Sequence, residues 1–169
     1  MRAQLQSLAH SRSYWVVLLL VALTMIAVAL YYQYGLEELP CVLCIQTRIW
    51  VSALILIALF ALTFRRKWLV VSAHGLSVVC AAGLLERSYQ LLGTERGFIF
   101  SDCGFDLGLP AWLALDKWLA PLFRVETSCG YTPELFAGIT MAEGLMALST
   151  ILLLISLTLT MAALLRQDY

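Results

Sequence analysis

The chain has 169 residues, of which 62% are hydrophobic and 13% are charged, and its mean hydropathy is +0.86. An average soluble domain carries about 25% charged residues, so this composition excludes an ordinary soluble protein and predicts a bilayer protein. The formal net charge is zero, which provides no basic surface, and no nucleic-acid partner is expected. The positions of the charges are more informative than their sum.

Four long stretches of the chain contain no charged residue: residues 13–36, 49–64, 68–85 and 144–165. A helix needs about 20 residues to cross the hydrocarbon core of a bilayer. The second and third stretches reach that length with their flanking residues, and only Arg48 interrupts the second. We therefore predict an all-α membrane protein, a bundle of four transmembrane helices at about 14–33, 45–64, 68–88 and 144–165. The first stretch is too long for a signal-peptide core and is interpreted as a retained span.

Basic residues flank the spans on one side of the predicted bundle: Arg2, Arg12, Arg65, Arg66, Lys67 and Arg166. Segments rich in Lys and Arg stay in the cytoplasm, so both termini are predicted there. The outward side then consists of a short loop at about 34–44 and a long loop at about 93–142, which hold most of the acidic residues. Residues 1–169 are interpreted as a single integral membrane domain.

The long outward loop contains an amphipathic segment at residues 107–123, delimited by Pro110 and Pro121. The pattern predicts a helix with its apolar residues on one side and Asp116 and Lys117 on the other. Such a helix either lies in the membrane interface or packs against the ends of the spans, and the pattern does not distinguish these alternatives.

The chain has five cysteines, namely Cys41, Cys44, Cys80, Cys103 and Cys129. All but Cys80 fall on the outward side, where oxidising conditions favour disulfides, and the simplest pairing joins Cys41 to Cys44 and Cys103 to Cys129. We favour thiol-disulfide exchange between the two pairs over a purely structural second bond. Cys80 lies within the third span, is interpreted as a small buried side chain and is given no role. Only one pair has the close spacing of zinc ligands, so no metal is expected.

Cys41 and Cys44 lie where the second span begins, and the positive end of a helix favours thiolates. With Arg48 they occupy positions i, i+3 and i+7, which share one helical face. An arginine near the hydrocarbon is costly, so we expect Arg48 to favour negative charge on Cys44 and on a reduced electron acceptor. The alternative is an interfacial anchor.

A dithiol that is repeatedly reduced needs an electron acceptor. The sequence contains no GxGxxG dinucleotide fingerprint and no pair of intramembrane histidines for haem. By elimination, the expected acceptor is a quinone dissolved in the lipid.

The Cys41–Cys44 motif after Pro40, with Arg48 four residues further on, occurs together with Cys103, Cys129 and an intervening Leu-Asp-Lys-Trp segment. With four spans, this combination closely resembles the disulfide bond formation protein B (DsbB) family over residues 14–165. The resemblance implies a protein of the bacterial inner membrane with its active cysteines on the periplasmic side.

The resemblance further implies a reaction sequence. Cys103 and Cys129 form the disulfide that a reduced periplasmic DsbA-type thiol-disulfide oxidoreductase attacks, with Cys103 making the mixed disulfide. Cys41 and Cys44 reoxidise that pair, and Cys44 passes the electrons to ubiquinone or menaquinone, with Arg48 beside the quinone ring. Such a pathway requires a strong terminal acceptor, because a DsbA-type partner is itself strongly oxidising.

Two other interpretations are open. A vitamin K epoxide reductase-like enzyme has similar helices, but its CxxC motif usually lies late in the bundle. A non-catalytic membrane scaffold would use its disulfides only to brace a binding loop. The sequence does not decide between ubiquinone and menaquinone, and Glu143, at the start of the fourth span, is interpreted as an interfacial acid.

Overall fold

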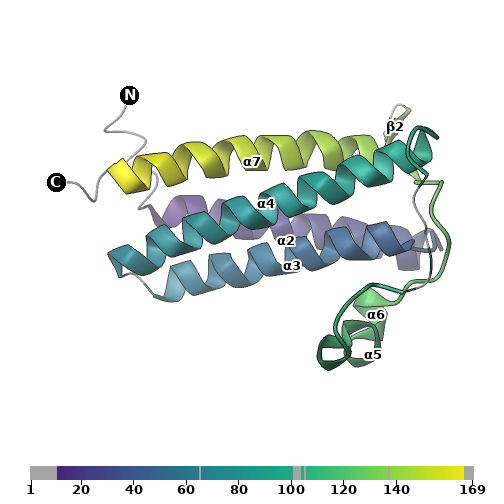
Figure 1. Ribbon diagram of the computed structural model, residues 1–169, viewed down its shortest axis with the longest axis horizontal. Coiled ribbons are helices and arrows are strands. Elements are labelled where there is room, and N and C mark those ends of the chain that lie inside the picture. Colours follow the sequence, from purple (N-terminus) through teal and green to yellow (C-terminus); the bar gives the residue numbers. More distant parts are fainter. Residues whose placement is uncertain (1–10, 65, 101–103, 105, 137, 166–169) are drawn as a thin grey trace.

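The computed structural model describes residues 11–64, 66–100, 104, 106–136 and 138–165. Within these residues four long helices run antiparallel to their sequence neighbours (Figure 1): α2 (Arg12–Gly35), α3 (Val42–Thr63), α4 (Lys67–Glu95) and α7 (Met141–Leu165). Each is long and apolar enough to cross a membrane. The prediction of a four-helix transmembrane bundle is confirmed.

The helices define two ends of the bundle. At one end α2 and α4 finish while α3 and α7 begin, and the described parts of the loops that connect α2 to α3 and α4 to α7 gather there (Figure 1). We call this the cysteine end, because Cys41 lies at the start of α3. α4 has 29 residues, which gives about 43 Å at 1.5 Å per residue. It is therefore longer than the hydrocarbon core, and its last turns, as far as Glu95, extend beyond the predicted end of this span.

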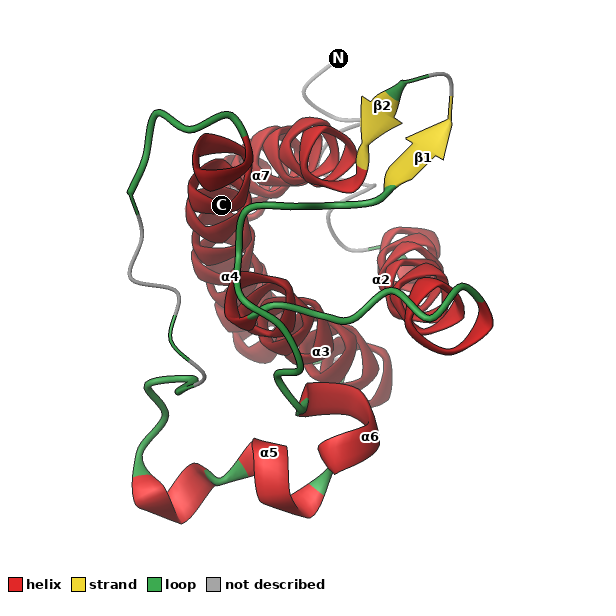
Figure 2. Cartoon of the chain, turned by 90° about the vertical axis from the view of Figure 1, so that its right-hand side faces the viewer, coloured by secondary structure: helices red, strands yellow, loops and turns green. Residues whose placement is uncertain are grey.

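The helices pack in the order α2, α3, α4 and α7, and from the cysteine end they form an open arc (Figure 2). Small residues let them approach closely. A Cβ atom on Gly83 of α4 would come within 2.5 Å of the Trp50 ring of α3. The central core is made of side chains from all four helices, with Trp15, Leu54 and Leu84 among its fully buried members. α2 and α7, at the two ends of the arc, both line a cavity that opens between them.

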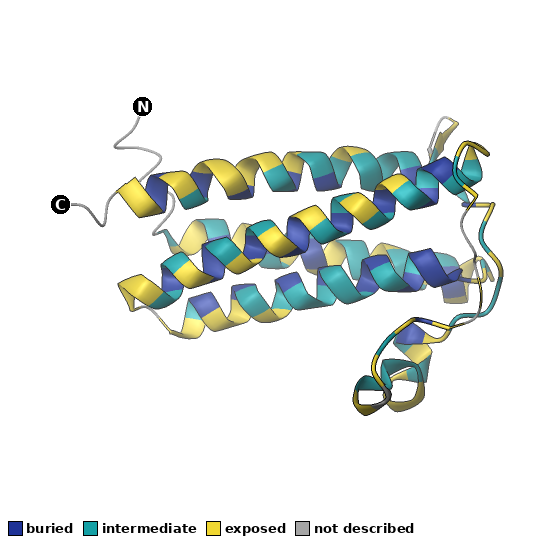
Figure 3. Ribbon diagram, viewed as in Figure 1, coloured by how far each residue is buried: buried dark blue, intermediate teal, exposed yellow. Residues whose placement is uncertain are grey.

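The outer faces of the helices carry exposed apolar side chains, such as Leu20, Leu56, Val79 and Leu154 (Figure 3). Soluble monomers rarely expose apolar surface on this scale. These faces are therefore suited to contact with lipid acyl chains.

The predicted helix at 107–123 is not continuous. The segment forms three short turns: η1 (Ala111–Leu113), α5 (Leu115–Trp118) and α6 (Ala120–Phe123). Proline inside a helix lacks the amide donor and clashes with the carbonyl four residues earlier. Pro121 would meet Lys117 in this way, and the chain avoids the clash by leaving helical geometry at Leu119, where φ is −130°.

The apolar side chains of this segment point in two directions. Leu115, Leu122 and Phe123 pack against the apolar cluster at the cysteine end, whereas Trp112 and Trp118 are exposed. Packing against the ends of the spans therefore describes one part of the segment, and the other part leaves an apolar surface uncovered.

A small hairpin precedes α7. Strands β1 (Glu134–Phe136) and β2 (Ile139–Thr140) pair antiparallel, with Glu134 opposite Thr140, and lie beside the opening between α2 and α7 (Figure 2). The Thr140 hydroxyl accepts a hydrogen bond from the Glu143 amide, and the Glu143 carboxylate accepts one from the Thr140 amide. This reciprocal pair is a capping box that begins α7. Glu143, interpreted as an interfacial acid, also forms an ion pair with Arg96.

Candidate redox site

Helix α3 begins at the predicted cysteine pair. Cys41 is the N-cap residue, in extended conformation, and its sulfur accepts a hydrogen bond from the Cys44 amide at 3.3 Å. This bond satisfies one of the amide groups that every helix start leaves without an intrahelical partner. The two sulfur atoms lie 2.7 Å apart, and both residues are free thiols in this structure. The helix start therefore holds the pair in contact.

The two thiols have different surroundings. Cys41 is 1% exposed, whereas Cys44 is half-buried and lines a cavity. The hydrogen bond from Cys44 lowers the pKa of Cys41, against the opposing effect of burial. When the pair is reduced, negative charge is therefore favoured at Cys41.

Arg48 lies almost two turns into α3 and is 6% exposed. Its Nη1 donates hydrogen bonds to Gln33 Oε1 at 2.6 Å and to the Leu122 carbonyl at 3.2 Å, and its Nη2 donates to the Ala29 carbonyl at 3.1 Å. Among the described residues, no carboxylate lies within ion-pair distance of the guanidinium. The guanidinium is thus hydrogen-bonded by neutral acceptors, without a direct ion pair among these residues. An anchor that reaches out to the interface would not be buried in this way.

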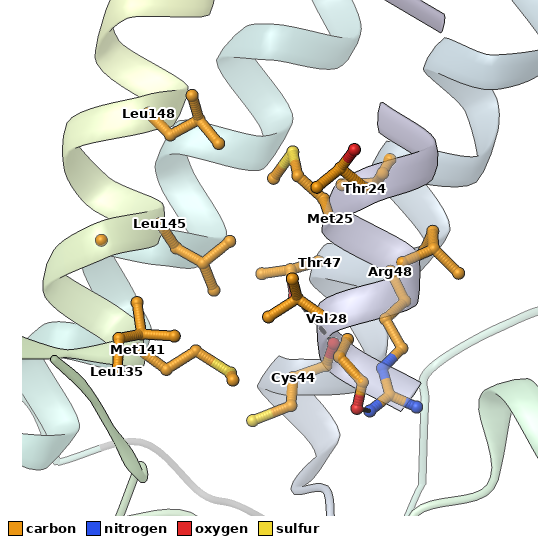
Figure 4. A pocket seen from close by; sticks show the side chains of 14 residues that line it. Thr24, Met25, Val28, Cys44, Thr47, Arg48, Leu135, Met141, Leu145 and Leu148 are labelled. Carbon is orange, nitrogen blue, oxygen red and sulfur yellow. Dashed lines mark hydrogen bonds between the residues drawn. The ribbon is translucent and has the colours of Figure 1, made fainter. Parts of the chain in front are cut away.

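A cavity of about 310 Å³ opens between α2, α3 and α7 (Figure 4). Cys44 and Arg48 both line it, and most of the remaining wall is apolar: Met25, Val28, Met141, Leu145 and Leu148. Leu135 of the hairpin also lines it, close to Gly144, where a Cβ atom would come within 2.7 Å of the Leu135 Cδ1 atom. The volume falls at the lower end of the range for small-molecule sites.

The long loop crosses the start of α3. The Glu126 and Thr127 amides donate to the Pro40 carbonyl at 3.0 Å and 3.3 Å, and Cys41 pairs with Thr127 in an isolated parallel bridge. Cys129 follows directly and packs against the same apolar cluster as Cys41. The loop thereby brings a third predicted cysteine to the cysteine end.

Of the predicted site residues, Cys41, Cys44, Arg48 and Cys129 lie at this one end. Cys129 takes part in a disulfide bond. Cys103 lies outside the described residues, so its pairing stays a prediction. Cys80 is a buried free thiol of α4 and does not line the cavity.

Sequence reasoning missed Gln33, which binds Arg48, and the neighbouring Glu126. Gln33 is 7% exposed, and its Nε2 lies 3.5 Å from the Glu126 carboxylate. The one signal in the sequence was an amide side chain near the end of the charge-free stretch at 13–36, where a polar group requires a partner. No sequence pattern indicated the cavity, because its existence depends on the distance between α7 and α2.

This arrangement has a defined chemical capability. Two adjacent thiols can form a disulfide and release two electrons and two protons. A buried cation one turn below Cys44 stabilises negative charge near that sulfur. The apolar cavity can admit a lipid-soluble molecule from the side of the bundle.

Comparison with known proteins gives a consistent result. The family model described as "Disulfide bond formation protein DsbB" matches residues 11–159. Disulfide bond formation protein B of Shewanella frigidimarina is 33% identical over 147 residues, which cover 85% of this chain and 86% of that protein. The protein of the same name from Shewanella amazonensis is 34% identical over 151 residues, covering 88% and 89%.

A more distant relative, disulfide bond formation protein B of Histophilus somni, is 29% identical over 141 residues, covering 82% of this chain and 79% of that protein. The matches span the membrane helices and the loops of the cysteine end, and they confirm the resemblance that the cysteine and arginine motifs indicated. The chain belongs to the DsbB family of disulfide bond formation membrane proteins.

Proposed function

We propose that this protein is a quinone-reducing thiol oxidase of the bacterial inner membrane, which reoxidises a periplasmic DsbA-type thiol-disulfide oxidoreductase. The observation that carries the proposal is that Cys44 and Arg48 line the same largely apolar cavity. A lipid-soluble, two-electron oxidant requires an apolar wall for binding. It also requires a reactive sulfur as the electron donor and a fixed cation to stabilise its reduced form.

The electrons move in three balanced steps. A thiolate of the reduced partner attacks Cys103, Cys129 leaves as a thiolate, and the second partner thiolate then releases the partner in its oxidised form. The reduced Cys103 and Cys129 next reduce the disulfide between Cys41 and Cys44 in the same way. The Cys41 and Cys44 dithiol finally forms its disulfide again, and its two electrons and two protons convert a quinone to a quinol.

The chain's own groups support the last step. The helix start holds the two sulfurs in contact, so little rearrangement separates dithiol from disulfide. The charge of Arg48 favours negative charge on an acceptor in the cavity as that acceptor is reduced. The apolar wall lowers the local dielectric constant, which strengthens this effect.

The proposed orientation rests on charge. Arg12, Arg66 and Lys67 lie at the end opposite the cysteine end, where α2 begins and α3 connects to α4 (Figure 1). Glu95, Glu126 and the cysteine pair lie at the other. Cytoplasmic retention of basic loops therefore directs the cysteine end to the periplasm.

Anaerobic turnover of the purified protein tests the proposal. We expect a reduced DsbA-type partner to be oxidised only when ubiquinone or menaquinone is added, and comparison of the two quinones identifies the preferred one. A partner with a single cysteine should form a covalent adduct that is absent from a Cys103→Ser variant. Turnover without quinone and oxygen would contradict the proposal, and a scaffold would give neither adduct nor turnover.

A further inference from the structure

The hydrogen-bond partners of Arg48 come from two separate parts of the chain. Ala29 and Gln33 belong to α2, whereas the Leu122 carbonyl belongs to the long loop. Gln33 itself reaches toward Glu126 of that loop. We propose that Gln33 is a positioning residue that holds the Arg48 guanidinium at the cavity and transmits to it the position of the loop that carries Cys129. This inference rests on the proposed function, which gives Arg48 its role.

An amide side chain suits this position chemically. Its oxygen accepts from Arg48 at 2.6 Å, while its nitrogen donates toward the Glu126 carboxylate over a longer distance, 3.5 Å. An amide offers an acceptor and a donor on one short planar group without adding charge. The negative charge of Glu126 is thereby kept one side chain away from the guanidinium, so the cation is oriented but not neutralised.

The loop is attached to the same place by several bonds. The Tyr34 hydroxyl of α2 donates to the Pro121 carbonyl at 2.7 Å, Arg48 donates to Leu122, and the Glu126 amide donates to Pro40. These bonds fix residues 121–127 between α2 and the start of α3. Cys129 lies only two residues beyond Thr127.

A movement of Cys129 therefore acts directly on this attachment. When thiol exchange draws Cys129 away from its place, Glu126 and Leu122 are displaced with it, and Arg48 keeps only its α2 partners. Gln33, freed from Glu126, then holds the guanidinium together with the Ala29 carbonyl. Gln33 therefore couples the position of the loop to the affinity of the cavity for quinone.

Substitution of Gln33 tests the inference. Gln33→Met should raise the quinone KM about tenfold, the loss expected for a hydrogen bond to a charged group, and should leave the KM for the thiol partner unchanged. Gln46→Met is the matched control, because Gln46 Nε2 also donates to a loop carbonyl, that of Leu107 at 3.2 Å, but contacts neither Arg48 nor the cavity.

A charged replacement separates positioning from packing. Gln33→Glu keeps the size and the acceptor but adds a charge that neutralises Arg48, so the quinone KM should rise at neutral pH. Lowering the pH until this carboxyl is protonated should return the KM toward the wild-type value measured at the same pH. A merely structural role would not give this recovery, and its absence would overturn the inference.

A double-mutant cycle tests the connection to the loop. Glu126→Gln should change the quinone KM by a few-fold in the wild-type background and have no effect in Gln33→Met, because residues that act through one another are not additive. If the wild-type protein turns over, two results would refute the coupling. One is additive effects of Glu126→Gln and Gln33→Met on the quinone KM, and the other is an equal quinone KM in Gln33→Met and Gln46→Met. Failure of the wild-type protein itself to reduce quinone would instead refute the proposed function.

Discussion

The two ends of the bundle are held together in different ways. In the half away from the cysteine end, side-chain hydroxyls donate to carbonyls of their own helix, as Ser77 does to Ala73 at 2.9 Å and Thr63 to Leu59 at 2.9 Å. At the cysteine end such local bonds also occur, as from Thr94 to Gln90 at 2.8 Å, but there further bonds join distant segments. Tyr32 of α2 donates to the Glu134 carbonyl at 3.0 Å, and Arg48 donates to Leu122. Local bonds survive when a neighbouring segment moves, whereas bonds between segments can be exchanged.

The apolar clusters show the same difference. The core that contains Trp15 consists of side chains from the helices alone, and its small residues bring the backbones close together. The cluster at the cysteine end includes Leu107 and Phe123 from the loop. We therefore expect substitutions in the first cluster to change stability and substitutions around the cavity to change function.

The largest expected effect lies in the first cluster. Trp15 is fully buried, and Trp15→Ala should lower the free energy of unfolding by about 3 kcal/mol, the low end of the range for such changes, since lipid rather than water surrounds the separated helices. Denaturant titration followed by circular dichroism measures the loss. If Trp15→Ala raised the quinone KM of the folded protein without lowering its stability, the proposed difference between the two clusters would be wrong.

Arg48→Met should have the next largest effect. Loss of the cation and of its hydrogen bonds should raise the quinone KM by about 10- to 100-fold, equivalent to about 1.5–3 kcal/mol. Steady-state turnover with varied quinone measures it. Arg87→Gln is the control, because Arg87 is a half-buried cation of α4 that forms an ion pair with Glu86 and does not line the cavity. Equal quinone kinetics in the two variants would remove Arg48 from the site.

Gly144→Ala should have a smaller effect. The added Cβ atom would lie 2.7 Å from the Leu135 Cδ1 atom, so Leu135 must shift within the cavity, at a cost of about 1 kcal/mol or roughly a fivefold rise in the quinone KM. At Gly75 of α4 an added Cβ meets nothing within 4 Å, so Gly75→Ala should leave the KM unchanged. An unaltered KM in Gly144→Ala would show that the hairpin does not shape the quinone site.

The sequence was sufficient for the features that depend on local composition. Charge-free stretches predict membrane helices because insertion depends on the hydrophobicity of the segment itself. The positions of Cys41, Cys44 and Arg48 follow from the helical repeat once the helix start is known. These residues are close in sequence, and the structure places Cys44 and Arg48 on the wall of one cavity.

Features that depend on distant contacts could not be predicted in the same way. Leu122 meets Arg48, and Glu126 meets Gln33, only because the loop returns to α2. The bonds from Arg48 to Leu122 and Ala29 use backbone carbonyls, which every sequence contains. The continuous helix expected at 107–123 differs from the structure because Pro121 was interpreted as a boundary. It breaks the segment internally instead, with Leu119 leaving helical geometry.

A single-turnover reaction tests the central claim most directly. In a variant with both Cys103→Ser and Cys129→Ser, only the Cys41 and Cys44 pair can exchange electrons at the cysteine end. Mixed anaerobically with quinone after reduction, the protein should form this disulfide and one equivalent of quinol, and a further Cys44→Ser change should abolish both products. Quinol formation without Cys44, or a folded protein whose reduced pair does not react with quinone, would contradict the account.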